Sequence, residues 1–275
     1  MIAPHAGYVY SGKVAGSAYR GIEKAGKQIK RVILFGPSHR VGFKGLALPS
    51  VDAFDTPLGR IPLDKAAIKR AVNMPNVQVM DEAHAEEHSL EVQLPFLQTV
   101  LKSFTLVPFC VGDASIEQVS DVLETFWGGP ETLIVISSDL SHYHDYKTCQ
   151  ELDNQTSEHI LAQKPVLEGK NACGARAING LLNSTKKLGL EGQLIEMNNS
   201  GDTAGAADKS RVVGYGAYYF GKLSMDDMVY NREMKQELVA LARNSIQHGL
   251  DKGRMIQNFK FPRHLATKVP TASFV

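Results

Sequence analysis

The sequence predicts an α/β protein in which helices cover a layered sheet, and two patterns along the chain support this class. Short apolar runs rich in β-branched and aromatic residues are typical of buried strands, and they occupy residues 31–36, 104–110 and 132–137. Segments with helical periodicity lie between these runs, so strands and helices alternate along the chain.

Six segments carry the helical pattern, at residues 11–25, 63–72, 89–101, 115–126, 148–161 and 172–182. Residues 2–5 are typical of the end of a strand whose beginning is missing. Residues 211–220 are rich in aromatic side chains and glycine, and we expect them to form the strand that closes this domain.

The pattern changes after Gly221. Residues 232–249 predict an amphipathic helix that ends at Gly249, and residues 271–275 form an apolar run with no partner strand after it. A lone strand does not fold by itself. We therefore expect one domain over residues 1–222, lacking the beginning of its N-terminal strand, and the truncated start of a second domain over residues 223–275.

Composition and motifs exclude several function classes. The chain has 30 basic and 29 acidic residues among 275, a balance with no electrostatic footprint for nucleic acid or an anionic membrane. No apolar run approaches the ~20 residues of a membrane-spanning helix, and the N-terminus lacks the pattern of a secretory signal, so we expect a cytoplasmic protein. Three cysteines without a CxxC pair fit neither a disulfide framework nor a zinc ribbon. The motifs GxSxG, GxGxxG and GxxxxGK[ST] are also absent from the sequence.

Two histidines follow predicted strands and are candidate metal ligands. His5 lies in a turn bracketed by proline and glycine, and His39 follows the strand at residues 31–36. If the strands before them are parallel, both imidazoles emerge at one edge of the sheet. Two imidazoles with a carboxylate leave open positions on iron, and Asp139 or Asp202 can supply that carboxylate. The alternative is that both histidines only satisfy hydrogen bonds in turns.

Other polar residues have both a structural and a functional interpretation. His88 and Glu91 lie near the start of a helix, where they either cap it or, one turn apart on one face, hold a substrate or a proton. Asp139 and His142 follow a strand, where a helix cap is the common role. Cys173 falls on the apolar face of a predicted helix and is more often a small core residue than a nucleophile.

Six motifs in order resemble one known family. They are APHAGY at residues 3–8, GPSH at 36–39, EHSLEVQLPF at 87–96, SSDLSH at 137–142, ACG at 172–174 and NSGD at 199–202. Together they resemble the MEMO1 family, called AmmeMemoRadiSam system protein B in prokaryotes, over residues 1–222. Residues 223–275 resemble the opening of an AMMECR1 domain.

The resemblance implies a fold like that of the class III extradiol (LigB-type) dioxygenases, a mixed, largely parallel sheet between helix layers with a metal crevice at one edge. It implies one iron(II) or copper ion, with His5 and His39 as ligands. Asp202 falls near the position of the third ligand, which is a cysteine in animal members and a carboxylate in the dioxygenases. Tyr8, Glu91 and Cys173, which lie in or beside the same motifs, are the candidate substrate-binding residues.

The sequence departs from the family where the dioxygenases use a catalytic histidine. Animal MEMO1 proteins keep a histidine a few residues after the Cys-Gly pair, whereas Arg176 stands in that stretch here. A guanidinium stays charged at neutral pH and cannot deprotonate a phenol. Ring cleavage by the usual general-base route is therefore not expected.

Three functions remain open at this point. The first is a metal-dependent oxidoreductase in which His88, Asp139 or His142 manages protons around a bound substrate. The second is a metal-binding scaffold that works with its AMMECR1 domain in cis and a radical SAM partner. The third is a plain α/β domain whose histidines are structural.

Overall fold

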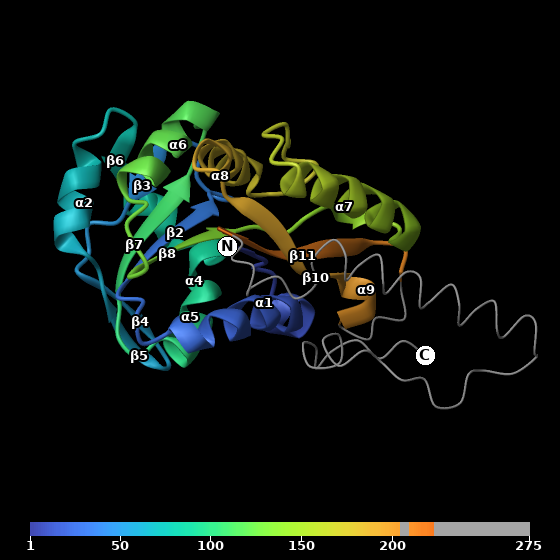
Figure 1. Ribbon diagram of the computed structural model, residues 1–275, viewed down its shortest axis with the longest axis horizontal. Coiled ribbons are helices and arrows are strands. Elements are labelled where there is room, and N and C mark those ends of the chain that lie inside the picture. The colour runs from blue at the N-terminus through green and yellow to red at the C-terminus, as the bar shows by residue number, and fades with distance from the viewer. Residues whose placement is uncertain (204–208, 223–275) are drawn as a thin grey trace, which may run out of the picture. The chain divides into compact units, whose positions relative to one another are not determined.

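A sheet of nine strands, in the order β10-β11-β1-β8-β2-β7-β3-β6 with β9 beside β11, runs through the computed structural model (Figure 1). The structure describes residues 1–203 and 209–222. The strands are β1 (Ile2–Ala3), β2 (Arg31–Pro37), β3 (Leu46–Leu48), β6 (Val77–Val79), β7 (Thr105–Val111), β8 (Thr132–Ser137), β9 (His142–His144), β10 (Glu191–Asn199) and β11 (Val212–Gly221), and a separate hairpin pairs β4 (Ala53–Thr56) with β5 (Gly59–Pro62). The second domain expected over residues 223–275 lies outside the described residues.

The centre of the sheet is parallel and its flanks are antiparallel. Strands β1, β8, β2 and β7 run in one direction, while β11 pairs antiparallel with β1 and β3 pairs antiparallel with β7. The predicted mixed, largely parallel α/β sheet is therefore confirmed, and the three apolar runs form β2, β7 and β8. The sequence patterns missed β3, β6 and β9, which have three residues each, and β10, whose side chains are mostly half-exposed.

Helices cover both faces of the sheet. The helices are α1 (Tyr8–Ile22), α2 (Lys65–Val72), α3 (Glu82–Ala85), α4 (His88–Glu91), α5 (Gln93–Val100), α6 (Ile116–Thr125), α7 (Tyr146–Leu161), α8 (Ala175–Lys187) and α9 (Ser200–Thr203), with a 3-10 turn η1 (Glu23–Ala25). Side chains of α2, α6, α7 and α8 pack in one apolar layer, and those of α1, α4 and α5 pack in the other (Figure 1).

Alternation along β2 shows how one strand serves both layers. Ile33 and Phe35 belong to the layer under α6 and α8, whereas Val32 and Leu34 belong to the layer under α1 and α5, and all four are fully buried. Side chains of a strand point to opposite faces in turn, so a strand covered on both faces is apolar at every position. Burial of each such side chain stabilises the fold by about 1.5–3 kcal/mol.

Two of the predicted helices differ from the observed ones in ways that affect the site. The helix expected over residues 89–101 is divided into α4 and α5, with Val92 between them. The helix expected over residues 172–182 begins only at Ala175, so Cys173 lies in the preceding turn and not on its apolar face. Within the described parts of the chain, no helix has the length and apolar character needed to cross a membrane.

The parallel strands bring several polar segments to one edge of the sheet. Because β1, β2 and β8 run in the same direction, His5, His39 and Asp139 all follow carboxyl ends at that edge. Helix α4 reaches the same edge, since the Ser89 hydroxyl donates a hydrogen bond of 2.9 Å to the Pro37 carbonyl. This arrangement assembles the site described below.

The contact between β2 and α4 leaves no room for a side chain at Gly36. A Cβ atom there would lie 2.5 Å from Ser89 Oγ and 2.8 Å from Leu90 Cδ2. We expect Gly36→Ala to lower the free energy of unfolding by about 1–3 kcal/mol, because the fully packed core cannot absorb the added methyl group. Urea unfolding measures the loss. Gly169→Ala is the control, since nothing lies within 4 Å of its Cβ position, and an equal effect of both substitutions would contradict the packing argument.

Candidate metal centre

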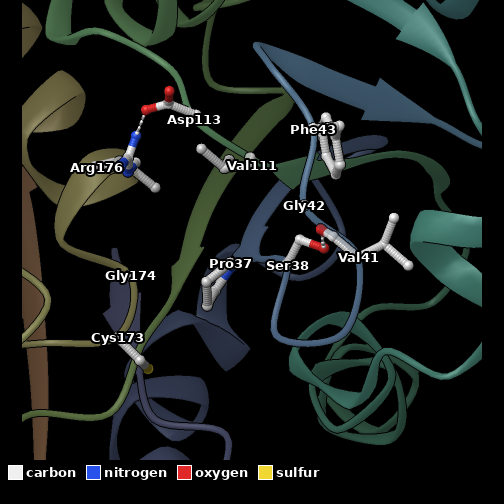
Figure 2. A pocket seen from close by; sticks show the side chains of 12 residues that line it. Pro37, Ser38, Val41, Gly42, Phe43, Val111, Asp113, Cys173, Gly174 and Arg176 are labelled. Atoms are coloured by element: carbon white, nitrogen blue, oxygen red, sulfur yellow. Dashed lines mark hydrogen bonds and ion pairs between the residues drawn. The ribbon is translucent and has the colours of Figure 1, made fainter.

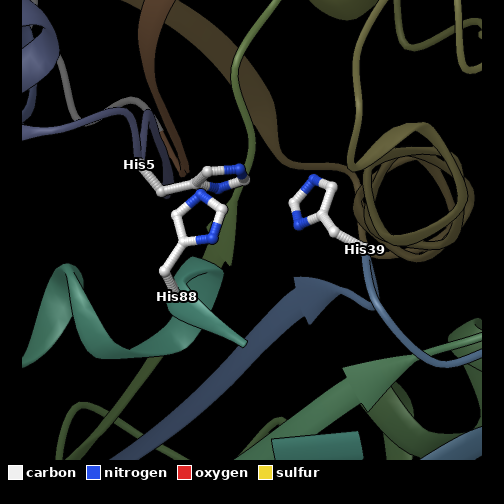
Figure 3. Close-up of side chains that lie close together, drawn as sticks. All are labelled: His5, His39 and His88. Atoms are coloured by element: carbon white, nitrogen blue, oxygen red, sulfur yellow. The ribbon is translucent and has the colours of Figure 1, made fainter. Parts of the chain in front are cut away.

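Three histidine rings converge at the carboxyl edge of the sheet (Figure 3). They are His5 after β1, His39 after β2 and His88 at the start of α4, and we call them the histidine cluster. One ring nitrogen of each lies within 4.8 Å of those of the other two. The ring centroids are 5.3 Å apart for His5 and His39, 5.5 Å for His5 and His88, and 5.3 Å for His39 and His88.

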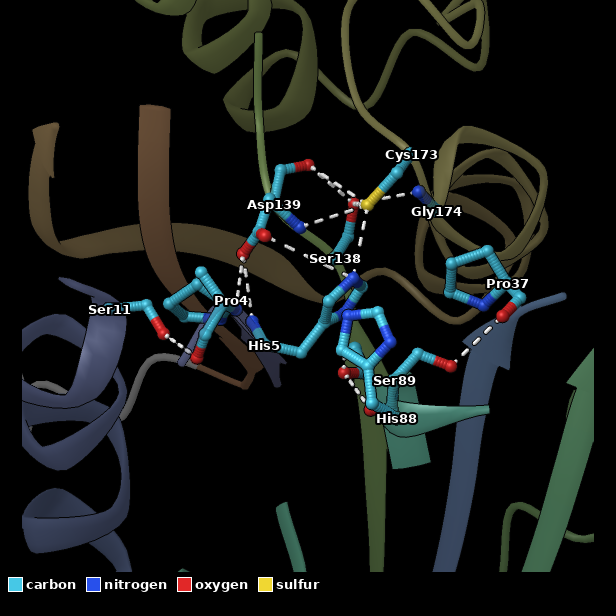
Figure 4. Close-up of polar contacts among 12 residues, drawn as sticks. Pro4, His5, Ser11, Pro37, His88, Ser89, Ser138, Asp139, Cys173 and Gly174 are labelled. Atoms are coloured by element: carbon cyan, nitrogen blue, oxygen red, sulfur yellow. Dashed lines mark hydrogen bonds and ion pairs between the residues drawn. The ribbon is translucent and has the colours of Figure 1, made fainter. Parts of the chain in front are cut away.

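His5 is held by the turn that follows β8. Its backbone N–H donates to Asp139 Oδ1 at 2.8 Å, and the N–H of Ala6 donates to the same oxygen at 3.2 Å (Figure 4). The residue is only 1% exposed. Burial lowers the pKa of His5 to about 4, because the protein interior disfavours the charged imidazolium. His5 is therefore neutral at physiological pH and carries one nitrogen lone pair.

The hydrogen bonds of Ser137 fix which nitrogen of His5 carries that lone pair. The Ser137 hydroxyl donates to the Ser89 carbonyl at 2.6 Å and accepts from the Gln93 side-chain amide at 2.7 Å. The remaining lone pair of the Ser137 oxygen can only accept a hydrogen bond. His5 Nδ1 lies 2.9 Å from this oxygen, so it is the ring nitrogen that carries the proton. The lone pair of His5 is thus on Nε2, which faces the cluster.

Glu87 orients the second histidine. Its carboxylate accepts from the His39 backbone N–H at 2.6 Å, from His39 Nδ1 at 2.9 Å and from the Ser89 N–H at 2.9 Å. Burial alone would raise the pKa of Glu87, but these hydrogen bonds from His39 and Ser89 outweigh it and lower the pKa to about 2. The ionised carboxylate holds the proton of His39 on Nδ1, so Nε2 is free to bind. His88 Nδ1 lies 3.7 Å from the same carboxylate.

Cys173 stands beside the cluster. Its Sγ lies 3.4 Å from His5 Nε2 and accepts the backbone N–H of Asp139 at 3.3 Å (Figure 4). Burial raises the pKa of Cys173 to about 12, so the side chain is a thiol unless a cation stabilises the thiolate. A sulfur donor is therefore within reach of the metal ligands.

A pocket of about 270 Å³ opens next to Cys173, between the ends of β2 and β7 and the start of α8 (Figure 2). Pro37, Val111 and Gly174 contribute to its walls, and the ion pair between Arg176 and Asp113 lies at its far side from Cys173. The cluster therefore adjoins a space that can hold a small molecule.

The structure does not bring every candidate residue to this place. Asp202, expected near the third ligand, lies on α9, where it accepts the Tyr146 hydroxyl at 2.7 Å and pairs with Lys209 at 2.9 Å. The third member of the cluster is His88 instead. Asp202 is therefore paired with Tyr146 and Lys209 and is not part of the group of converging ligands.

The remaining candidates have separate surroundings. Asp139 is 4% exposed and its Oδ2 lies 4.0 Å from His5 Nε2, so it belongs to the surroundings of the cluster. His142 lies on β9, and its Nδ1 donates to the Leu140 carbonyl at 2.8 Å. Tyr8 donates to the Val92 carbonyl at 3.3 Å and lies near Glu91, and both side chains are exposed. Within the described residues, the structure shows no hydrogen bond or ion pair between the histidine cluster and His142, Tyr8 or Glu91.

Sequence patterns missed the side chains that orient the histidines. Glu87 precedes His88 and also caps α4 by accepting the Ser89 N–H. Ser137 and Gln93 meet only because β8 and α5 are packed together. The one signal in the sequence was a carboxylate directly before a candidate ligand, since histidine ligands usually have a carboxylate or another acceptor behind them.

The cluster fits a transition-metal ion. Two of its rings present Nε2 with the proton held elsewhere, by Ser137 for His5 and by Glu87 for His39. Imidazole nitrogens supported in this way, with a cysteine sulfur close by, form a donor set typical of iron, copper and zinc, and not of magnesium or calcium. His5, His39 and His88 are therefore the residues able to hold the metal, with Cys173 as a neighbouring donor.

Comparison with known proteins places these residues in a family context. Residues 1–219 match the family model described as Memo-like protein. A MEMO1 family protein of Nitrosopumilus maritimus is 36% identical over 233 residues, covering 80% of this chain and 83% of that protein. Another, of Thermoplasma acidophilum, is 38% identical over 226 residues, covering 78% and 82%. An uncharacterized Escherichia coli K12 protein of known structure aligns with a TM-score of 0.48 and 10% identity over 78% of this chain and 98% of its own.

Ser137→Ala tests the orientation of His5. Removal of the hydroxyl lets the His5 ring exchange its proton between both nitrogens, so we expect metal affinity, measured by competition with a chelator, to fall about 10–100-fold. Ser120→Ala is the matched control, because Ser120 is equally buried and its hydroxyl also donates to a backbone carbonyl, that of Gly180. Equal affinity of the two variants would contradict the role of Ser137.

The buried His5 also predicts a pH dependence of the metal-free protein. Its pKa is about 4 in the folded state against 6.5 in the unfolded chain, so the unfolded chain binds the proton more readily between these values. Stability is therefore lost as the pH falls from about 6.5 to 4, with a slope that approaches about 1.4 kcal/mol per pH unit. Urea unfolding across this range measures the slope, and His5→Gln should remove its share. Parallel profiles of the two proteins would show that His5 does not titrate in this way.

Proposed function

The chain belongs to the Memo-like family, and on this premise we propose that it is a metal-binding protein whose histidine cluster holds one transition-metal ion. The observation that carries the proposal is the convergence of His5, His39 and His88, with one ring nitrogen of each within 4.8 Å of the others. Each ring comes from a different segment of the chain. Histidines that only satisfied hydrogen bonds in their own turns would not need to converge in this way.

We propose iron(II) or copper as the ion. Imidazole nitrogen suits both metals, and the Cys173 sulfur, 3.4 Å from His5 Nε2, adds a softer donor that copper and iron accept. The buried carboxylate of Glu87 lies behind His39 and His88 and has no lysine or arginine partner among the described residues. Its negative charge therefore favours a cation in the cluster.

The proposed activity is that of a metal-dependent oxidoreductase acting on a small molecule. A bound redox metal would supply Lewis acidity and electron transfer at its open positions. The chain itself contributes neutral ligands, a buried Asp139 carboxylate beside His5, and a pocket that adjoins Cys173. Arg176 is paired with Asp113 and stays charged, so it does not act as a general base. This excludes Arg176 as the base of a dioxygenase-like ring cleavage.

Metal content of the full chain, purified without oxygen, tests the proposal. We expect about one iron or copper ion per chain by mass spectrometry, and its loss in His5→Ala, His39→Ala and His88→Ala, since each removes one of three converging ligands. His84→Ala and Asp202→Asn are the controls. His84 Nε2 donates to the Ala47 carbonyl and Asp202 binds Lys209, so both variants should keep the metal.

The result separates the candidate functions. A folded wild type that takes up neither iron nor copper after reloading would overturn the metal site. Loss of the metal in Asp202→Asn, but not in His88→Ala, would restore Asp202 as the third ligand. Stoichiometric metal without oxidation of any tested substrate is the outcome that a scaffold working with AMMECR1 and radical SAM partners predicts.

A further inference from the structure

We propose that the pocket beside the histidine cluster binds a small organic carboxylate, anchored by Arg176, with the apolar body of the ligand directed toward Cys173. This inference deepens the proposed function, because it names the class of molecule that would lie next to the metal. It rests on the proposed function only for the role of the metal. The binding of the carboxylate follows from the pocket itself.

The walls of the pocket select a small ligand with an apolar body. Its lining includes Pro37, Val41, Phe43, Val111 and Ala177 (Figure 2). The volume of about 270 Å³ lies just below the range of about 300–1,000 Å³ typical of sites for drug-sized molecules. A free inorganic anion would leave these apolar walls uncovered, whereas an organic acid covers them.

Arg176 contributes a permanent cation at the far side of the pocket, where Asp113 is its ion-pair partner. Asp113 engages the guanidinium through one nitrogen, Nη1. Nε and Nη2 have no partner within the described residues, and this edge of the guanidinium matches the two oxygens of a carboxylate.

The backbone supports the same charge preference. Gly174 N–H donates to Ser138 and Ala175 N–H to the Ala172 carbonyl, while the N–H groups of Arg176 and Ala177 have no acceptor among the described residues. Helix α8 begins without a side-chain cap, so its positive end adds to the guanidinium. An anion beside Arg176 satisfies donors that the protein leaves open.

Cys173 lies between the pocket and the histidine cluster. Its side chain lines the pocket, and its Sγ lies 3.4 Å from His5 Nε2. Ser38, which precedes His39, lines the same pocket. A carboxylate held by Arg176 therefore leaves the other end of the ligand facing Cys173, next to the cluster.

Titration of the metal-loaded full chain with benzoate, followed by calorimetry, tests the proposal. We expect benzoate to bind at millimolar or lower concentration and Arg176→Gln to weaken it tenfold or more, because the anchoring charge is lost. Asp113→Asn should strengthen binding several-fold, because it removes the carboxylate that competes for Arg176. Benzamide, which has the same body without the charge, and inorganic phosphate, which has charge without the body, should both bind more weakly than benzoate.

Arg60→Gln is the matched control. Arg60 is also an exposed arginine paired with an aspartate, Asp55, but it lies on the β4-β5 hairpin, so its substitution should leave benzoate affinity unchanged. Absent benzoate binding, equal weakening by both arginine variants, or equal binding of benzamide or phosphate would overturn the proposal. Metal content is measured in the same samples. Benzoate binding that depends on Arg176 in a chain that takes up no metal supports the pocket and rejects the metal site. Stoichiometric metal without benzoate binding supports the metal site and rejects the pocket.

Discussion

The anchoring of α4 to the carboxyl edge of the sheet is the constraint on which the site depends. Ser89 donates from its hydroxyl to Pro37 on β2 and accepts at its carbonyl from Ser137 on β8. Because Gly36 has no side chain, the helix approaches β2 closely enough for these bonds to form. The same approach places His88 opposite His5 and His39, and it places Glu87 where one carboxylate serves both as helix cap and as partner of His39. One packing contact thus determines the position of His88 and, through Glu87, the orientation of His39.

Charge balance explains why this arrangement favours a cation. His5 accepts a proton poorly, since burial lowers its pKa to about 4, while Glu87 remains ionised with a pKa of about 2. The buried Glu87 carboxylate is kept ionised by hydrogen bonds from His39 and the Ser89 N–H, and no lysine or arginine of the described residues pairs with it. A metal ion in the cluster would supply the missing positive charge and would also stabilise the thiolate of Cys173. The negative charge of Glu87 and the nitrogen and sulfur donors of the site therefore both favour a bound metal ion.

The sequence predicted the parts of the fold that local residue patterns determine. It predicted the parts of the site that follow from the direction of the parallel strands. The fully apolar runs of β2, β7 and β8 identified the central strands, and their parallel order implied that His5 and His39 would emerge together, as their 5.3 Å ring separation shows. The break at Val92 and the late start of α8 were not visible, because tertiary contacts fix helix ends that propensity leaves open. Ser137 and Gln93 could not be connected from the sequence, since 44 residues separate them. Asp202 resembled a ligand by motif, but its partners Tyr146 and Lys209 are decided by the packing of α7 against β11.

Arg176 shows how one residue changes the chemistry that the same framework can support. A histidine at this stretch could move a proton, whereas a guanidinium cannot, so position 176 supplies no general base. The guanidinium instead supplies a fixed positive charge at the far side of the pocket, and in the proposed site this charge orients the bound anion before any reaction. A site of this kind favours ligands that are already acidic and bind as anions, because such molecules need no general base to reach the charged form that a metal prefers. The absence of a general base at this position and the proposed preference for a carboxylate therefore follow from a single side chain at the start of α8.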